Sequence, residues 1–212
     1  MEKIVLVGGG GHCKVIIDIL NSIKKYEIVG VTDKEGAEKK ILDIPVIGDD
    51  SILESLYESG VKNAFVSIGA LDNIEIRDKI YFKLKNIGFK IPKLIHNKAI
   101  VSPYAEIKDG TCVMAGAVVN PGAVIGENCI INTSSVIEHD CIIGRNTHIS
   151  PRSSIAGGVK IGYNCHIGIG SSVIQGITVG NNAVIGAGAV ILNDIESNVT
   201  AVGIPGKIIK RR

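Results

Sequence analysis

Between positions 101 and 191, every sixth residue of the chain is valine or isoleucine, sixteen times without a miss. An α-helix repeats every 3.6 residues and a β-strand every two, so neither explains a period of six. A hexapeptide β-helix does, because each six-residue unit supplies one short strand and one corner. With three units to a coil, residues 18 apart stack on one face. The anchors are Val101, Ile107, Val113, Val119, Ile125, Ile131, Ile137, Ile143, Ile149, Ile155, Ile161, Ile167, Val173, Val179, Ile185 and Ile191.

The columns beside the anchors support this register. The position two residues before each anchor is mostly small, because a narrow prism has room for one large aliphatic side chain per face. Three cysteines fall in this inward column, so we expect them to be reduced packing residues: Cys129, Cys141 and Cys165. The position three residues after each anchor is mostly Gly, Asn or Asp, which tolerate the positive φ of a tight corner.

Residues 1–94 follow a different pattern, in which short apolar strands alternate with helices. This alternation predicts a small parallel, Rossmann-like α/β sheet, followed over residues 95–212 by the all-β helix. Strands are expected at Lys3–Val7, Ile28–Thr32, Ile44–Ile47 and Asn63–Ile68. Apolar spacing predicts helices carrying Ile16, Ile19, Leu20 and Ile23, and later Ile76, Ile80, Leu84 and Ile87, with a further helix from Asp49 or Asp50 to about Ser59.

Composition excludes several classes of function. The net charge is only +2 and the basic residues are scattered, so nucleic-acid binding is not expected. No signal-peptide layout and no apolar run of membrane-spanning length are present, and the five cysteines form no C-x-x-C pair. We therefore expect a cytoplasmic protein without membrane insertion. A basic cluster at Lys207, Lys210, Arg211 and Arg212 is expected to be a frayed, solvated end rather than a phosphate contact.

Four glycines, Gly8 to Gly11, separate the first strand from the first helix and precede His12. Such a loop lets backbone N–H groups approach a phosphate at a helix N-terminus. The dinucleotide fingerprint is not met, because Cys13 occupies its third glycine position, so a smaller phosphorylated ligand is favoured. Asp33 ends the second strand, where a carboxylate could bind a ribose hydroxyl. Alternatively the glycines form only a tight turn that Asp33 caps; Gly69 has the same two interpretations.

His139 and Asp140 lie two and three residues after an anchor, which places both at a prism corner. An imidazole there could accept a proton from a nucleophile, and a neighbouring carboxylate would raise its basicity. Asp140 also suits a corner column of Gly and Asn, so its presence has a structural explanation too. His148 and His166 are 18 residues apart, point outward and should stack. No third ligand is in register with them, so no metal site is expected.

The chain resembles the hexapeptide-repeat acyltransferases that acetylate bacterial surface sugars. This group includes sialic-acid O-acetyltransferases and N-acetyltransferases of nucleotide-linked 4-amino sugars. The resemblance spans essentially the whole chain. Its most specific segment is Asn132 to Cys141, with sequence NTSSVIEHDC, supported by the VGGGGH loop at 7–12, by Ser67 to Gly69 with Arg77 following, and by the terminal VGIPGK.

The family implies a homotrimer of left-handed parallel β-helices, with active sites between adjacent subunits and acetyl-CoA along the groove between them. It implies that His139 is the general base and that Asp140 raises its basicity. His148, Ile169 and Ala187 match positions that contact acetyl-CoA. The sugar nucleotide would be held by Gly10, Gly11, His12, Asp33 and Gly69.

The function expected from this resemblance is acetyl-CoA-dependent N-acetylation of a UDP-linked, bacillosamine-type 4-amino sugar in bacterial surface glycan synthesis. A separate phosphate-cradling domain favours this acceptor over free sialic acid. O-acetylation of sialic acid or a related sugar remains the nearest alternative. Two alternatives from other classes are a non-catalytic trimeric binding or scaffold protein and a zinc-dependent β-helix enzyme such as a carbonic anhydrase.

Overall fold

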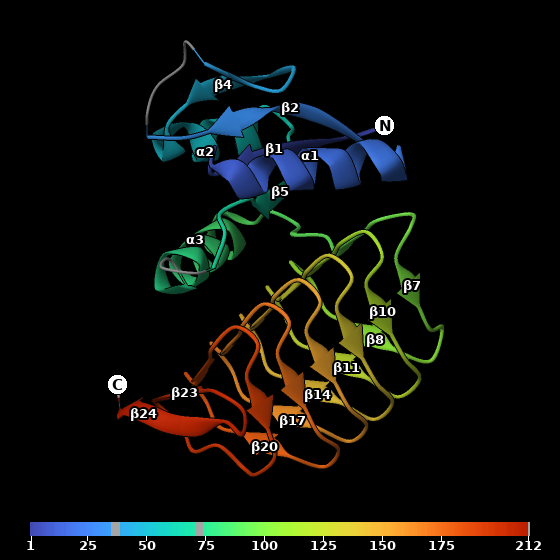
Figure 1. Cartoon of the computed structure of the whole chain (residues 1–212). Helices are drawn as coiled ribbons and strands as arrows, with labels where there is room; N and C mark the ends of the chain where they lie inside the picture. Colours follow the sequence, from blue (N-terminus) through green and yellow to red (C-terminus); the bar gives the residue numbers. More distant parts are fainter. Residues whose placement is uncertain (35–38, 71–73, 212) are drawn as a thin grey trace. The chain divides into compact units, whose positions relative to one another are not determined.

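The computed structural model describes residues 1–34, 39–70 and 74–211. The chain divides into two compact units, Met1–Asn97 and Lys98–Arg212. Figure 1 shows the first as a layered arrangement of strands and helices and the second as a coil of short strands.

The first unit alternates strands and helices, as its sequence predicts. Its parallel strands take the order β4-β2-β1-β5, and the short β3 adds to β4 as an antiparallel edge. The order reverses at β1, because the chain leaves β1 on one side for β2 and later returns on the other side as β5. The elements are β1 Glu2–Val7, α1 Gly11–Ile23, β2 Tyr26–Thr32, β3 Lys40–Ile41, β4 Ile44–Gly48, a 3-10 turn Asp50–Ile52, α2 Leu53–Glu58, β5 Asn63–Val66 and α3 Ile74–Ile87.

This topology places a ligand crevice beyond the carboxyl ends of β1 and β5. In open α/β sheets, ligands bind at the point where the strand order reverses. The glycine loop leaves β1 at that point, and Ile68 and Gly69 follow β5 beside it. The fold therefore brings two separate predicted site segments to one edge of the sheet.

Helix α3 differs from the prediction in the face that it buries. Its buried residues are Arg77, Tyr81 and Leu84, whereas Ile76 is 46% exposed. The guanidinium of Arg77 is fully buried and donates hydrogen bonds of 2.9 and 2.8 Å to the carbonyl oxygens of Val66 and Ile68. These buried carbonyl groups at the end of β5 need hydrogen-bond donors. The face of α3 that packs against the sheet therefore carries an arginine.

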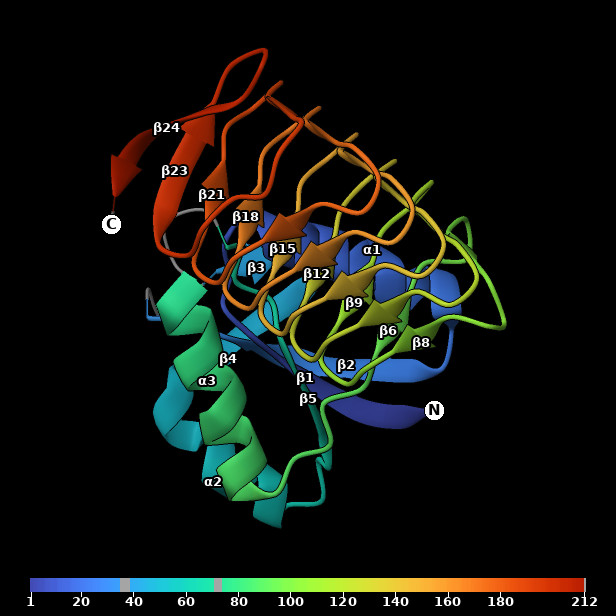
Figure 2. The ribbon, with the colours of Figure 1, turned by 90° about the horizontal axis from the view of Figure 1, so that it is seen from below.

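The second unit is a parallel β-helix of three strand ladders, which confirms the fold predicted from the six-residue period. Figure 1 shows two of the ladders and Figure 2 the third. The first ladder has the order β22-β19-β16-β13-β10-β7, the second β20-β17-β14-β11-β8, and the third β24-β23-β21-β18-β15-β12-β9. Here they are called faces D, E and C, respectively.

Nearly all strands of the β-helix are two residues long. Strand β6, Leu94–Ile95, belongs to the first unit. The strands of the second unit are β7 Ile100–Val101, β8 Glu106–Ile107, β9 Cys112–Val113, β10 Val118–Val119, β11 Val124–Ile125, β12 Ile130–Ile131, β13 Val136–Ile137, β14 Ile142–Ile143, β15 His148–Ile149, β16 Ser154–Ile155, β17 Lys160–Ile161, β18 His166–Ile167, β19 Ser172–Val173, β20 Thr178–Val179, β21 Val184–Ile185, β22 Val190–Ile191, β23 Val199–Val202 and β24 Lys207–Arg211.

The register is the predicted one. Residues 18 apart are paired, as in Val119 with Ile137 and Ile131 with Ile149. Every anchor from Ile107 to Ile191 is buried, and only Val101 in the first coil is partly exposed. Burial of these aliphatic side chains supplies the main favourable term in the stability of the prism.

The corner residues have the predicted positive φ values. Two further residues, which the sequence pattern does not predict, also have positive φ. Ser134 and Arg152 take φ of 56° and 58° in the corner column that otherwise holds glycine. Another corner stacks asparagines, in which the side-chain amide of Asn128 donates to Asn146 at 2.9 Å and that of Asn146 to Asn164 at 2.8 Å. The ladder continues through Asn182 to Asn198.

The carboxyl end of the chain is ordered, contrary to the expectation of a frayed tail. Lys207–Arg211 forms strand β24, which pairs antiparallel with β23. Arg212 lies outside the described residues. Among the residues that the structure describes, no helix has the length and apolar character needed to cross a bilayer.

Candidate active site

His139 and Asp140 form a hydrogen-bonded pair at a corner of the prism. The Nδ1 atom of His139 lies 2.9 Å from Oδ2 of Asp140, and the two side chains are 64% and 74% exposed. Because a carboxylate only accepts, Nδ1 is the protonated nitrogen and Nε2 is left as the acceptor. The corner thus presents an imidazole, oriented by a carboxylate, to the outside of the chain.

The next coil leaves space for this imidazole. A Cβ at Gly157, one coil further on, would lie 2.5 Å from Nε2 of His139, so only glycine leaves room for the ring. A hollow of about 400 Å³ lies beside the corner on the outer face of ladder D. Its lining includes Glu138, Ser154, Ser172 and Gln175.

The expected acetyl-CoA residues gather at a different corner, which joins face C to face D. His148 is on the outer surface of face C, where the side-chain amide of Asn132 donates to its Nε2 at 3.0 Å. Its ring packs edge-on against that of His166, with centroids 5.0 Å apart, as the stacking prediction requires. His148 is only 7% exposed, so it is not a solvated side chain.

Ile169 and Ala187 stack one coil apart at this same corner. The backbone N–H of Gly188 donates to the carbonyl of Ile169 at 2.8 Å, and a Cβ at Gly168 would lie 2.6 Å from the nitrogen of Ala187. Ile169 is 57% exposed, and Ala187 is exposed as well. The corner between faces C and D is therefore an open edge of the prism, called the C–D edge. It runs from Asn132 toward the carboxyl end and carries Ile169 and Ala187.

A second hollow, of about 520 Å³, lies at the glycine loop of the first unit. Its lining includes all five residues that the sequence assigns to a sugar nucleotide: Gly10, Gly11, His12, Asp33 and Gly69. Lys34, Ile76 and Ile80 line it as well. The partial exposure of Ile76 is explained by its position on the wall of this hollow.

The glycines of the loop divide into two kinds. Gly8 has φ of +104°, and a Cβ at Gly9 would lie 2.9 Å from Oδ2 of Asp33, so the chain itself requires both. A Cβ at Gly10 or Gly11 would meet nothing within 4 Å, and at Gly69 it would meet only the Cβ of His12, at 3.8 Å. Neither internal packing nor a positive φ explains glycine at these three positions, which favours close approach of a ligand.

Asp33 and His12 shape the polar surroundings of this hollow. The Oδ2 atom of Asp33 accepts a hydrogen bond of 2.6 Å from the N–H of Gly9, so the carboxylate braces the loop, as the capping alternative predicts. The Nε2 atom of His12 is buried and has no hydrogen-bond partner in the described part of the chain. Burial, assisted by the nearby charge of Arg77, lowers the pKa of His12 to about 3. His12 is therefore neutral at physiological pH.

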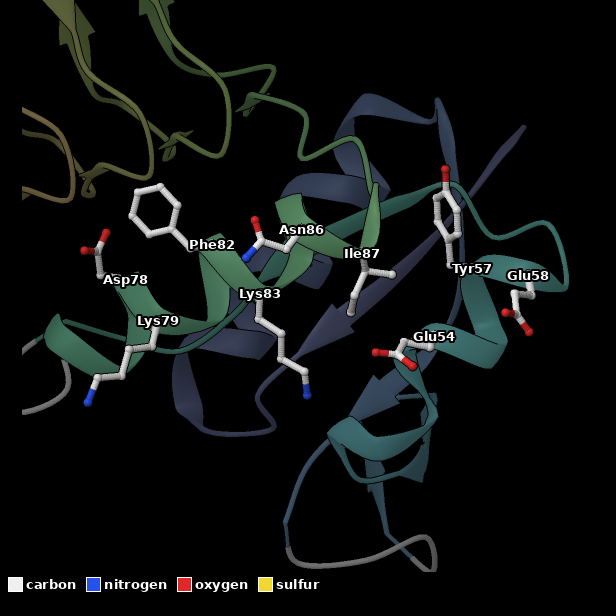
Figure 3. Close-up of a pocket in the computed structure, with 9 residues that line it drawn as sticks. All are labelled: Glu54, Tyr57, Glu58, Asp78, Lys79, Phe82, Lys83, Asn86 and Ile87. Atoms are coloured by element: carbon white, nitrogen blue, oxygen red, sulfur yellow. The ribbon is translucent and has the colours of Figure 1, made fainter.

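A hollow larger than that at the glycine loop lies between α2 and α3, with a volume of about 670 Å³ (Figure 3). Its walls combine Glu54, Glu58 and Asp78 with Lys79 and Lys83. None of the site residues named above lines it, and Lys83 is engaged with the carbonyl of Asp50 at 2.9 Å. Size alone does not identify the functional site in this chain.

Sequence reasoning omits two polar side chains that the structure places in these sites. Asn132 orients His148, and Arg77 supports the Ile68 wall of the glycine-loop hollow. Both lie in segments that the resemblance singles out, but only three-dimensional contacts reveal their roles. Residues 1–34, 39–70 and 74–211 hold no group of three or more His, Cys, Asp or Glu side chains arranged to bind a metal ion.

Comparison with known proteins connects these sites to a family. Residues 3–84 match the model of the PglD N-terminal domain. Residues 104–139 and 122–157 match the bacterial transferase hexapeptide, and residues 158–193 match the hexapeptide repeat of succinyl-transferase. The chain is also 36% identical to a perosamine N-acetyltransferase from Caulobacter crescentus, with a TM-score of 0.94 over 99% of this chain and 98% of that one.

The chain belongs to the hexapeptide-repeat sugar acetyltransferases. This acetyltransferase is also 37% identical to the acetyltransferase domain of PglB from Neisseria gonorrhoeae, with a TM-score of 0.93 over 99% of this chain and all of that one. The Caulobacter protein was solved with CoA and GDP-perosamine, and the Neisseria domain with acetyl coenzyme A.

Proposed function

We propose that the protein transfers the acetyl group of acetyl-CoA to the amine of a nucleotide-linked 4-amino sugar. The observation that carries this proposal is the glycine-loop hollow, in which three glycines stand open without a structural need for glycine. Full-length similarity to an enzyme that was crystallised with CoA and GDP-perosamine supports the same acceptor class. A free sugar would leave this phosphate-cradling loop without a role.

In this proposal His139 is the general base. Its Nε2 takes a proton from the sugar amine as the nitrogen attacks the thioester carbonyl, and Asp140 stabilises the imidazolium that forms. The tetrahedral intermediate then collapses with loss of the CoA thiolate, and the proton on His139 neutralises the leaving group. The cysteines take no part, because all five are buried, and burial raises the pKa of Cys165 to about 11.

The active site is proposed to form between subunits of a homotrimer. His139 is at the corner that joins face D to face E, whereas His148, Ile169 and Ala187 flank the C–D edge. These are different edges of one prism, so one site can include both sets only if a neighbouring copy supplies the second. An active monomer, measured by light scattering on the column fraction that is assayed, would contradict this arrangement.

The nucleotide is proposed to be UDP and the sugar a bacillosamine-type 4-amino sugar, because the chain resembles that branch of the family. The GDP-perosamine bound to the Caulobacter relative makes GDP the main alternative. The glycine-loop contacts described above are compatible with the phosphates of either nucleotide.

The deciding experiment follows thiol release from acetyl-CoA with three acceptors, a UDP-linked 4-amino sugar, GDP-perosamine and free sialic acid, and with buffer alone as the blank. Release with a nucleotide-linked amine, abolished in His139→Ala, supports the proposed reaction and identifies the nucleotide. Release with sialic acid alone would replace it by O-acetylation. Tight acetyl-CoA binding without turnover of any acceptor would instead favour a non-catalytic binding protein.

A further inference from the structure

The C-terminal hairpin, which comprises β23, the turn at 203–206 and β24, continues the C–D edge of the prism. The N–H of Val190 donates to the carbonyl of Gly203 at 3.1 Å, and that of Gly206 donates to Val190 at 2.7 Å. A Cβ at Gly186 would lie 2.7 Å from Cγ1 of Val202. The hairpin turn therefore stacks directly beyond Ala187, on the edge that already carries Ile169.

The hairpin directs two lysines to the outer surface of face C. In the antiparallel pair β23–β24, Lys207 lies opposite Val202 and Lys210 opposite Thr200. Directly opposed residues on paired strands share one face of the sheet. Thr200 is itself the partner of Val184, which stacks on His166 and His148. Lys207 and Lys210 are thus on the same outer surface as His148, at its carboxyl end.

These two lysines differ from the arginine beside them. The guanidinium of Arg211 lies 2.7 Å from Oε2 of Glu196, an ion pair that ties β24 to the chain before it. Lys207 and Lys210 are exposed, and their ammonium groups have neither an ion pair nor a hydrogen bond to any residue that the structure describes. The ordered hairpin therefore presents two ammonium groups, with Ile204 exposed at the adjoining turn.

The spacing along face C fits one ligand of the proposed reaction. His148 is on β15 and the hairpin begins at β23, three strand steps further on, which corresponds to about 14 Å at the usual separation of paired strands. Coenzyme A carries its thiol at one end of an extended pantetheine arm and its diphosphate and adenosine 3′-phosphate at the other. A donor whose arm passes His148, Ile169 and Ala187 would bring its phosphates to the hairpin.

We propose that Lys207 and Lys210 bind the phosphates of the nucleotide end of coenzyme A. This inference rests on the proposed function and assigns the basic end of the chain to donor recognition. An acyl carrier protein shares the phosphopantetheine arm but lacks the adenosine and its 3′-phosphate. The hairpin would therefore select free acyl-CoA over a carrier-bound acyl group.

The test compares the wild type with the double variant Lys207→Gln, Lys210→Gln. Both positions are exposed, so the fold should be retained, and an unchanged melting temperature checks this. Calorimetric titrations use CoA, 3′-dephospho-CoA and pantetheine as separate probes. They contain no acceptor, so they measure binding alone. The matched control is Lys160→Gln, which removes an exposed lysine from face E.

We expect the double variant to bind CoA about tenfold more weakly, because two charge-assisted contacts are lost. Pantetheine binding should be unchanged and the control should match the wild type. A smaller loss with 3′-dephospho-CoA would place the contact at the 3′-phosphate, and an equal loss would place it at the diphosphate. Equal CoA affinity in all three proteins, or an equal loss for pantetheine, would overturn the inference.

The proposed function can fail independently of this inference. If CoA binds and the double variant weakens it, but no amino sugar is acetylated, the hairpin assignment stands and the acceptor is wrong. If acetylation proceeds with an unchanged KM for acetyl-CoA in the double variant, the reaction stands and the hairpin assignment is wrong. Higher salt should weaken CoA binding more in the wild type than in the double variant.

Discussion

The Nδ1 atom of His139 lies 2.9 Å from Oδ2 of Asp140, although the two residues are adjacent in the chain and both side chains stand mainly in solvent. Here Asp140 takes φ of 58° at the corner, which brings its carboxylate alongside the preceding imidazole. The residue that turns the chain also orients the proposed base.

Replacement of His139 by asparagine should lower kcat by about 10²–10⁴-fold, the usual contribution of a general base. The exposed side chain should make little difference to stability, and CoA binding should persist because the proposed donor contacts are on another edge. Steady-state kinetics with the preferred amino sugar and calorimetry with CoA separate the two effects. A variant that keeps more than a tenth of the wild-type kcat would remove His139 from the mechanism.

Asp140→Asn keeps the shape and the left-handed conformation, which asparagine tolerates well, but removes the negative charge. We expect kcat to fall about tenfold with KM for both substrates unchanged, because only the stabilisation of the imidazolium is lost. Asp140→Gly provides the control for backbone conformation and should be at least as slow. Full activity in Asp140→Asn would mean that the carboxylate serves the corner alone.

Gly10→Ala should separate stability from binding. The position has ordinary backbone angles and open space, so alanine should leave the unfolding free energy unchanged or raise it by up to about 1 kcal/mol. The added methyl group would occupy the path of the phosphate, so the KM for the sugar nucleotide should rise at least tenfold. Gly8→Ala is the contrasting variant, because φ of +104° predicts destabilisation there. Unchanged KM in Gly10→Ala would favour a plain turn.

His12 should make stability depend on pH. Its pKa in the folded chain is lowered to about 3 from 6.5, so between these values the unfolded chain binds more protons. The associated stability is complete above pH 6.5 and is lost as the pH falls toward 3. Urea unfolding of the wild type and of His12→Gln across this range measures the effect. The variant should show a shallower slope; identical slopes would refute burial of a neutral imidazole.

Two adjacent isoleucines test the register of the β-helix. Ile143 is 1% exposed, so Ile143→Asp buries an unpaired carboxylate and should unfold the prism at 25 °C. Ile142 is 48% exposed on the outer surface, so Ile142→Asp should retain a cooperative melt within a few degrees of the wild type. Similar melting temperatures for the two variants would show that the inward and outward columns are misassigned.

The β-helix was predictable almost residue by residue, because its period is imposed by backbone geometry that repeats in every coil. Each aliphatic anchor, small inward residue and corner glycine satisfies a local demand. Ser134 and Arg152 escape this logic, since their positive φ is imposed by the stacked neighbours and not by their own preference. The column that contains them runs along the C–D edge.

The candidate site was less accessible to sequence reasoning. A strand, a glycine run and a helix predict an anion-binding loop, but they do not show which glycines the chain needs for itself. That distinction depends on Asp33, whose carboxylate approaches Gly9 from another strand. Likewise, apolar spacing assigned Ile76 to the buried face of α3, whereas Arg77 occupies it because two carbonyl groups at the end of β5 require donors.

The C-terminal hairpin also has a consequence for self-association. A parallel β-helix ends in an open strand, whose unpaired N–H and C=O groups can template the addition of another chain. Strand β24 covers the free edge of β23 with an antiparallel partner that carries three positive charges. Deleting it would expose the edge of β23, which carries no charged residue. The proposed phosphate contacts would be lost, and end-to-end fibres would be expected to grow at the same time.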